Sequence, residues 1–202
     1  LNDYLDEHSL DGLTIGIDPK LVTKTGYNRY AESISKARGQ LTALDVNPVD
    51  AIWCDQPAMS APAAWRMGDA VAGQSVTDKL QLLADDLRQQ NLRAALLSRV
   101  DAVNWLVNMR GGDLPCTPVN LCFAFFDCDH GLTLLGDGDR LAPVLDQDIA
   151  VKPLADLPDL LALCAGDALL IEPASLPQAL SIEIAASDVE MVEGDCPVTP
   201  MK

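Results

Sequence analysis

Short apolar runs that alternate with amphipathic stretches of helical length restrict the fold of residues 75–202 more than any other feature of the chain. Strands are predicted at 92–98, 119–128, 132–136, 149–154 and 167–172. The intervening stretches predict helices, and "DCDHG" joins the second and third strands as a hairpin turn. Strands that alternate with helices and include one antiparallel hairpin favour a mixed sheet flanked by helices, which is an α/β fold.

The first helix of this region has the clearest pattern. "SVTDKLQLLADDLRQQN" begins with Ser75 as a helix cap, and Asp78 follows three residues later. Its apolar face is formed by Val76, Leu80, Leu83 and Leu87. This helix is therefore expected to pack on the sheet.

Residues 13–46 predict a smaller strand, helix and strand, with the helix stopped at Gly39. One such unit does not bury both faces of a sheet, so further chain is expected upstream. Residues 55–74 are rich in Pro, Ala and Gly and predict a linker that Trp53 and Trp65 pin to a domain surface. The expected organisation is residues 1–54 as the end of a first domain, 55–74 as linker and 75–202 as a second domain.

The charge of the chain excludes some partners. Its formal net charge is -16 at pH 7, which disfavours nucleic acid and anionic membrane surfaces. No apolar stretch approaches the roughly 20 residues needed to span a bilayer, and the first residues show no basic region followed by an apolar one. A cytoplasmic protein is expected.

Catalytic and metal-binding motifs are scarce. The six cysteines form no CxxC pair and are expected to be reduced. Cys128 and His130 would need two more ligands for a tetrahedral metal site, and the other histidine, His8, is expected at the surface. The acidic turn at 127–138 lacks the ligands of a calcium loop, and "GDGDR" at 136–140 is expected to be a turn. These residues predict no catalytic, cofactor or metal site.

The stretch "VDAVNWLVNMRGGDLPCTPVNLCFAF" at 100–125 resembles a segment of three-domain aminopeptidases P, the Xaa-Pro aminopeptidases of the pita-bread metallopeptidase family. "IGIDP" at 15–19 and "NPVDAIWCDQP" at 47–57 are similar to the end of that family's first domain and its linker, and "DGDR" and "TPMK" to a hairpin and a last strand of its second domain. The matching residues of the long stretch are Asp101, Trp105, Leu106, Asn108, Arg110, Gly111, Asp113, Pro118 and Val119.

The resemblance implies a creatinase/prolidase N-terminal-domain fold with a ribonuclease H-like motif. It also implies a noncatalytic portion of an Xaa-Pro aminopeptidase that walls the active-site cleft and supports a homodimer. The family holds two divalent metal ions, Mn or Zn, on a catalytic domain that would begin beyond Lys202. The implied partners are therefore the chain's own catalytic domain and short peptides with proline second. Whether the parent protein is active is left open, and this portion is expected to be inactive alone.

Arg110 and Asp113 are the candidate substrate-binding residues, because the resemblance places "NMRGGD" at the cleft edge. The structural alternative is an Arg110–Asp113 pair, or hydrogen bonds to backbone carbonyls, that fix the turn before the strand. Gly111 and Gly112 are expected to supply a positive φ or a close backbone approach.

Two other functions are considered. Histone-chaperone subunits share the pita-bread architecture without metals, and a charge of -16 suits a basic peptide as partner. A creatine or proline-dipeptide hydrolase relative is disfavoured, because those proteins usually have two domains and lack the "IWxDxP" linker. Metal-ligating residues downstream of Lys202 would distinguish the peptidase from the binding module.

Overall fold

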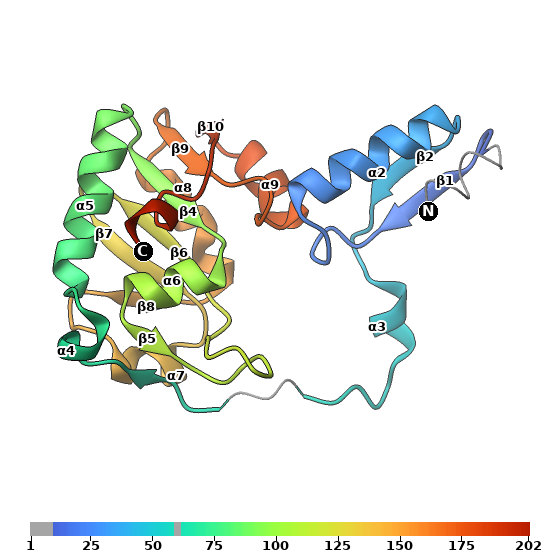
Figure 1. Cartoon of the computed structure of the whole chain (residues 1–202). Helices are drawn as coiled ribbons and strands as arrows, with labels where there is room; N and C mark the ends of the chain where they lie inside the picture. Colours follow the sequence, from blue (N-terminus) through green and yellow to red (C-terminus); the bar gives the residue numbers. More distant parts are fainter. Residues whose placement is uncertain (1–9, 59–61) are drawn as a thin grey trace. The chain divides into compact units, whose positions relative to one another are not determined.

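The computed structural model describes residues 10–58 and 62–202 of the chain. The chain divides into two compact units, residues 1–59 with 173–182 and residues 60–172 with 183–202 (Figure 1). His8 lies outside the described residues. The domain limits expected at residues 54 and 75 stay a prediction.

The first unit contains the predicted strand, helix and strand. Strands β1 (Thr14–Ile17) and β2 (Gln40–Ala43) pair in parallel, and α2 (Lys24–Lys36) connects them. The Thr23 side chain caps α2 by accepting a hydrogen bond from the Gly26 N–H at 3.1 Å. A short helix, α3 (Pro48–Ile52), follows. This arrangement confirms the expected order of elements.

The end of α2 differs in detail from the expectation. Arg38, with φ of 66°, takes the left-handed conformation after the helix, so the predicted stop at Gly39 is wrong by one residue. The Gly39 N–H donates to the Ile34 carbonyl at 2.9 Å. Gly39 is suited to its place because a Cβ there would lie 2.9 Å from Leu10 Cβ.

A distant segment of the chain returns to this unit. The Lys24 N–H donates to the Leu176 carbonyl at 2.8 Å, and the Thr25 N–H donates to the Pro173 carbonyl at 3.1 Å. These bonds satisfy two amide groups at the start of α2 that the helix itself leaves unpaired. Residues 173–182 thereby belong to the first unit although they follow most of the second in sequence.

The second unit is built on a six-stranded mixed sheet of order β10-β9-β4-β6-β7-β8. The β6–β7 hairpin and the β4–β6 pair are antiparallel, whereas the β10–β9, β9–β4 and β7–β8 pairs are parallel. The mixed α/β sheet is therefore confirmed. Its strands are β4 (Ala94–Leu97), β6 (Phe123–Asp127), β7 (Gly131–Leu135), β8 (Ala150–Lys152), β9 (Ala168–Ile171) and β10 (Glu190–Glu193).

Helices cover both faces of this sheet. Helices α5 (Val76–Gln89) and α6 (Val100–Leu106) pack on one face, and α8 (Leu157–Leu163) lies on the other (Figure 1). All four residues of β4 are buried, as expected for a central strand covered on both sides. The predicted apolar face of α5 is confirmed, with Leu80 only partly buried and Lys79 fully buried beside it.

The second unit also contains shorter elements. They are β3 (Trp65–Arg66), α4 (Asp69–Ala72), β5 (Met109–Arg110), α7 (Gly138–Leu141), η1 (Ala142–Val144), η2 (Leu154–Asp156) and η3 (Thr199–Met201). Helix α9 (Gln178–Ala185) runs from the first unit into the second.

Two of these short elements correct the sequence analysis. The turn expected at 136–140, likened to a hairpin, is largely a helical turn, because the Asp137 side chain caps α7 by accepting from the Arg140 N–H. The last strand expected at 199–202 is instead the 3-10 turn η3. Pro200 lies in its first turn, where the missing N–H costs no helical hydrogen bond.

Candidate functional site

Asp113 is buried in the loop after β5 and is held by Arg140 of α7. The Asp113 and Arg140 side chains are 2% and 12% exposed. Arg140 Nη1 donates to Asp113 Oδ1, and Arg140 Nη2 donates to Asp113 Oδ2 at 2.9 Å. The Leu121 N–H also donates to Asp113 Oδ2 at 2.6 Å. The carboxylate therefore joins α7 to both ends of the loop between residues 113 and 121.

The protonation behaviour of the pair follows from these contacts. Burial alone would raise the pKa of the Asp113 carboxyl, but the hydrogen bonds from Arg140 and from the Leu121 N–H hold that pKa below its ordinary value of 3.8. The hydrogen bond to Asp113 raises the pKa of the Arg140 guanidinium. Both groups are thus charged at neutral pH.

Two buried asparagines extend this network to α6. Asn104 Oδ1 accepts from the Asn120 N–H at 2.9 Å and from Asn120 Nδ2 at 3.1 Å, and Asn104 Nδ2 donates to the Asn120 carbonyl at 2.9 Å. Asn120 Oδ1 in turn accepts from Arg140 Nη1 at 3.3 Å. Both asparagine residues are at most 1% exposed. The amide oxygen and nitrogen of both asparagines are hydrogen-bonded, and a network of this kind fixes one position for the loop.

Arg110 does not pair with Asp113. It lies on β5, opposite Trp65 of β3, and its Nη1 donates to the Met109 carbonyl at 2.7 Å and to the Asn104 carbonyl at 3.3 Å. Of the two structural alternatives, the Arg110–Asp113 pair is therefore wrong and the hydrogen bonds to backbone carbonyls are present. The Asp113 carboxylate instead pairs with the guanidinium of Arg140, which is distant in the sequence. A role of Arg110 and Asp113 in substrate binding stays a prediction.

The glycines of this turn act through close approach. A Cβ at Gly111 would lie 2.1 Å from Asn120 Oδ1, and one at Gly112 would lie 3.1 Å from Pro62 Cγ. Neither glycine has a positive φ; near this turn Asn108 and Cys116 have φ values of 51° and 60°. Gly111 is thus needed because the asparagine network leaves no room for a side chain.

Lys79 forms a second buried polar centre below the same turn. Its Nζ donates to the Trp105 carbonyl at 2.8 Å and to Asn108 Oδ1 at 2.5 Å, and lies 3.8 Å from the centre of the Trp105 ring. Asn108 Nδ2 donates to the Gln74 carbonyl at 2.9 Å. Burial is the main cause that lowers the pKa of Lys79 from its ordinary value of 10.5, and repulsion from Arg110 adds to it.

The sequence analysis did not predict the residues that form these two polar centres with Asp113, namely Lys79, Asn104, Asn120 and Arg140. Lys79 had a usable signal, because it lies three residues after Val76 and four before Leu83 on the apolar face of its helix. No comparable periodic signal marks Arg140, whose role depends on a contact across 27 residues.

The described residues do not fit a metal centre. Among residues 10–58 and 62–202, no group of three or more His, Cys, Asp or Glu side chains could hold a metal ion. His130 lies in the β6–β7 turn, as expected, with Nδ1 3.3 Å from Asp127 Oδ2. All six cysteines are free thiols. Within the described parts of the chain, no helix has the length and apolar character needed to cross a bilayer.

Comparison with known proteins identifies relatives of this architecture. A protein of Colletotrichum graminicola named "Probable Xaa-Pro aminopeptidase P" is 33% identical over 158 residues, covering 75% of this chain and 25% of the relative. A protein of Aspergillus niger with the same name is 31% identical over 156 residues, again covering 75% and 25%. The chain thus spans about a quarter of the length of these curated relatives.

A solved structure shows the same fold. The X-prolyl aminopeptidase of Caenorhabditis elegans, described as a cytosolic enzyme with a di-nuclear active site, superposes with a TM-score of 0.80 and 21% identity. The match covers 98% of this chain and 34% of the other. Residues 55–202 also match the sequence model of the family described as Creatinase/Prolidase N-terminal domain. The chain therefore belongs to the creatinase/prolidase N-terminal domain family, as its resemblance to aminopeptidases P implied.

Proposed function

We propose that this chain is the noncatalytic N-terminal portion of a metal-dependent Xaa-Pro aminopeptidase, an enzyme that removes the first residue of peptides with proline second. The observation that carries the proposal is the 33% identity to a relative with that name over three quarters of the chain. The two divalent ions, Mn or Zn, are assigned to a separate catalytic domain. No step of the hydrolysis is assigned to the described residues, because they offer no set of metal ligands.

Within that enzyme, the chain would supply a wall of the active-site cleft and a scaffold for a cytoplasmic homodimer. The loop between residues 113 and 121 suits a wall because the hydrogen bonds of the Asp113 carboxylate with Arg140 and the Leu121 N–H hold it before any peptide arrives. A surface fixed in advance loses little conformational entropy on binding. In this proposal Asp113 positions the loop and does not touch the peptide, since its side chain is 2% exposed and already bonded.

Arg110 is the better candidate for a direct contact. It is partly exposed, and its hydrogen bonds to the Met109 and Asn104 carbonyls both come from one nitrogen, Nη1. The remaining guanidinium N–H groups suit the carbonyl oxygens of a short peptide. In the complete enzyme, Arg110→Ala should raise KM with little change in kcat or in melting temperature. A parallel loss of melting temperature would contradict the contact and favour a role in the turn.

The proposal is tested by comparing the complete reading frame with this 202-residue chain. Each protein is incubated with Mn²⁺ and a tripeptide that has proline second, and the released first residue is quantified by chromatography. The complete protein should hydrolyse this peptide and spare a matched peptide with alanine second, whereas the chain alone should hydrolyse neither. Hydrolysis by the chain alone would contradict its noncatalytic role.

A nonenzymatic module that binds basic, histone-like peptides is the second candidate, and the net charge of -16 favours it. The same preparations distinguish the two functions. If the complete protein hydrolyses no proline peptide but binds a lysine-rich peptide with an affinity that falls steeply with salt, the binding module is supported and the peptidase is not.

A further inference from the structure

Arg110 differs from the other arginines of the second unit in its lack of a carboxylate partner. Among the described residues of that unit, each of the others forms an ion pair with an aspartate, and Arg110 forms none; the paired arginines are Arg66, Arg88, Arg93, Arg99 and Arg140. The chain has 30 acidic residues against 14 basic ones, so carboxylates are abundant. The charge of Arg110 is therefore left for a partner other than these carboxylates.

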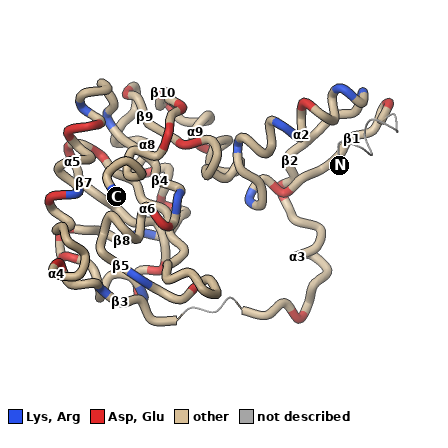
Figure 2. Tube along the Cα trace, viewed as in Figure 1, with Lys and Arg blue, Asp and Glu red and all other residues tan. Residues whose placement is uncertain are grey.

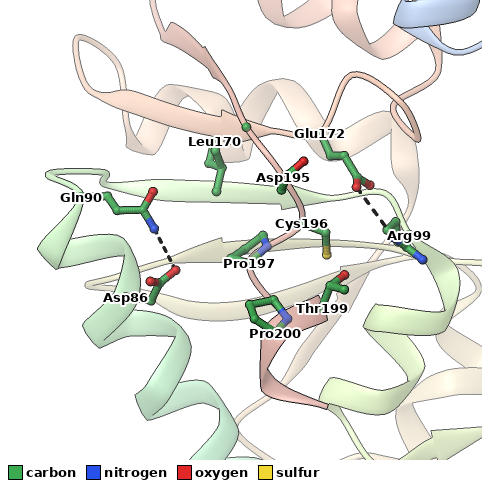
Figure 3. A pocket seen from close by; sticks show the side chains of 11 residues that line it. Asp86, Gln90, Arg99, Leu170, Glu172, Asp195, Cys196, Pro197, Thr199 and Pro200 are labelled. Atoms are coloured by element: carbon green, nitrogen blue, oxygen red, sulfur yellow. Dashed lines mark hydrogen bonds and ion pairs between the residues drawn. The ribbon is translucent and has the colours of Figure 1, made fainter.

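Arg99 shows the usual arrangement in this unit. It lines a cavity beside residues 194–200, and Figure 3 shows its side chain directed at Glu172. Its Nη1 lies 3.8 Å from Glu172 Oε1, and its Nε donates to Asp101 Oδ1 at 3.4 Å. Asp101 and, to a smaller extent, Glu172 raise the pKa of the Arg99 guanidinium. The protein itself thus compensates the charge of Arg99.

Arg110 is held by neutral oxygen atoms at one nitrogen. Its Nη1 donates to the Met109 carbonyl at 2.7 Å and to the Asn104 carbonyl at 3.3 Å, the second of which belongs to the last turn of α6. In the part of the chain that the structure describes, the Nε and Nη2 groups of Arg110 have no hydrogen-bond partner. These two groups form one edge of the guanidinium, and such an edge binds both oxygens of a carboxylate. Because Arg110 is partly exposed, this edge is suited to a carboxylate from a ligand.

Lys79 adds positive charge near Arg110. Its Nζ is bonded to the Trp105 carbonyl and to Asn108 Oδ1, which are both neutral. After burial, repulsion from Arg110 is the next cause that lowers the pKa of Lys79, and attraction from Asp69 opposes it. Asp69 Oδ1 also accepts from Asn108 Nδ2 at 3.3 Å. An anion bound to the free edge of Arg110 would therefore reduce the repulsion between the two cations.

Trp65 supplies an apolar surface beside Arg110. Strands β3 and β5 are antiparallel with Trp65 directly opposite Arg110, so both side chains lie on the same face of this two-stranded sheet. Figure 2 shows basic residues along these two strands. Trp65 is 48% exposed. Trp and Arg are the residue types that contribute most to binding at peptide and protein interfaces, so this pair suits a ligand that has an apolar group next to a carboxylate.

We propose that Arg110 and Trp65 bind the C-terminal residue of the peptide substrate. Arg110 would bind the terminal carboxylate through Nε and Nη2, and Trp65 would contact the apolar side chain of the same residue. The inference rests on the proposed peptidase function and deepens it by naming the substrate class, which is short peptides with a free C-terminal carboxylate. Because Arg110 has a fixed place, a peptide gains this contact only when its length lets its end reach the guanidinium.

The test uses the complete protein with Mn²⁺ and peptides of three, four and five residues. Each has proline second and leucine last, and each is prepared as the free acid and as the C-terminal amide. At one or more of these lengths, the acid should have a KM about threefold to tenfold lower than the amide at similar kcat, because the amide cannot form the charged pair. Added salt should reduce this difference.

Two outcomes would overturn the proposal. One is an equal KM for acid and amide at all three lengths. The other concerns a third set of peptides, amides that have glutamate last: if these alone have the lower KM, the bound group is a side-chain carboxylate and not the terminal one.

Variants assign the effect to the two residues. Arg110→Ala should abolish the difference between acid and amide, and Arg110→Lys should keep part of it, because the charge remains but the planar guanidinium is lost. Trp65→Ala should raise KM about threefold for peptides that end in leucine and much less for those that end in glycine. Arg88→Ala removes an exposed, paired arginine on α5 and should leave every KM unchanged. A persistent difference between acid and amide in Arg110→Ala would overturn the site. If melting curves show that Arg110→Ala does not fold, an undiminished difference in Arg110→Lys does the same.

Failure of this inference is distinguishable from failure of the peptidase function. If the peptides are hydrolysed with equal KM, the peptidase function stands and the inference alone is overturned. If none is hydrolysed, the peptidase function is contradicted, and calorimetry of the same peptides with the metal-free protein decides the inference. Tighter binding of the acid by wild type than by Arg110→Ala supports the carboxylate site, and equal binding overturns it.

Discussion

Arg140 and Lys79 are both cations below the surface of the second unit, but Arg140 has an anionic partner whereas the groups that bind Lys79 are neutral. Arg140 faces the Asp113 carboxylate, which raises the pKa of the guanidinium. Lys79 faces a carbonyl, an amide oxygen and an indole ring, and burial lowers its pKa. The stability contributed by a buried ion pair thus depends on both partners, whereas a cation held by neutral groups can be replaced with a smaller loss in the free energy of unfolding.

The largest effect is expected from Asp113→Ala. This change leaves the Arg140 side chain, 12% exposed, with only the exposed Asp137 carboxylate at 3.9 Å as counter-charge, and removes the acceptor for the Leu121 N–H. Breaking a buried pair from one side costs about 3–5 kcal/mol. Urea unfolding of the 202-residue chain should show a fall of that size in the free energy of unfolding.

Two controls sharpen this expectation. Asp146→Ala removes the partly exposed Arg66–Asp146 pair and should cost about 0–1 kcal/mol. Asp113→Leu combined with Arg140→Met should be closer to wild type than either single change, because no charge remains buried. A single Asp113→Ala variant as stable as Asp146→Ala would show that the Asp113–Arg140 pair contributes nothing to the fold.

Gly111→Ala should have the next largest effect, about 2–3 kcal/mol by analogy with overpacked cores. The new Cβ would meet Asn120 Oδ1 at 2.1 Å, so Asn120 must move and release its hydrogen bonds to Asn104. Gly138→Ala is the matched control, since a Cβ there meets nothing within 4 Å, and it should change stability by less than about 1 kcal/mol. Equal unfolding midpoints for both variants would refute the close approach at Gly111.

The sheet could be predicted from sequence, whereas the contacts around Arg140 could not. The apolar runs at 119–128 and 132–136 predicted the hairpin formed by β6 and β7, because strand formation depends on local patterning and a short turn. The partner of Asp113 could not be predicted from local sequence. Arg110 is only three residues away, but the partner is Arg140, which follows 27 residues later on a helix that was predicted to be a turn. Such a choice depends on tertiary packing, which periodicity does not encode.

Lys79→Met should have a smaller effect, a loss of about 0–2 kcal/mol. The methionine fills a similar volume but leaves the Trp105 carbonyl and Asn108 Oδ1 without their donor, which costs about 1–3 kcal/mol. The removal of a desolvated charge offsets part of that loss. Thermal unfolding, with Leu80→Met on the same helix as a volume control, measures the difference. A loss equal to that of Asp113→Ala would show that the two cations are held in the same way.

The smallest effect is the pH dependence, which shows that the charge of Asp113 stabilises the fold whereas the charge of Lys79 destabilises it. The folded-state pKa of Asp113 lies below 3.8, so its contribution is present above about pH 4 and is lost as pH falls through the folded pKa. The folded-state pKa of Lys79 lies below 10.5, so the cost of its buried charge is present at neutral pH and is relieved as pH rises from the folded pKa toward 10.5. Wild type should therefore lose its advantage over Asp113→Ala in acid and gain on Lys79→Met in alkali, by about 1.4 kcal/mol for each unit of pKa shift. Free energies of unfolding measured from pH 3 to pH 10 for the three proteins decide this: both differences should rise with pH, and a difference between wild type and Lys79→Met that stays flat or falls toward pH 10 would mean that Lys79 is stabilised as a cation after all.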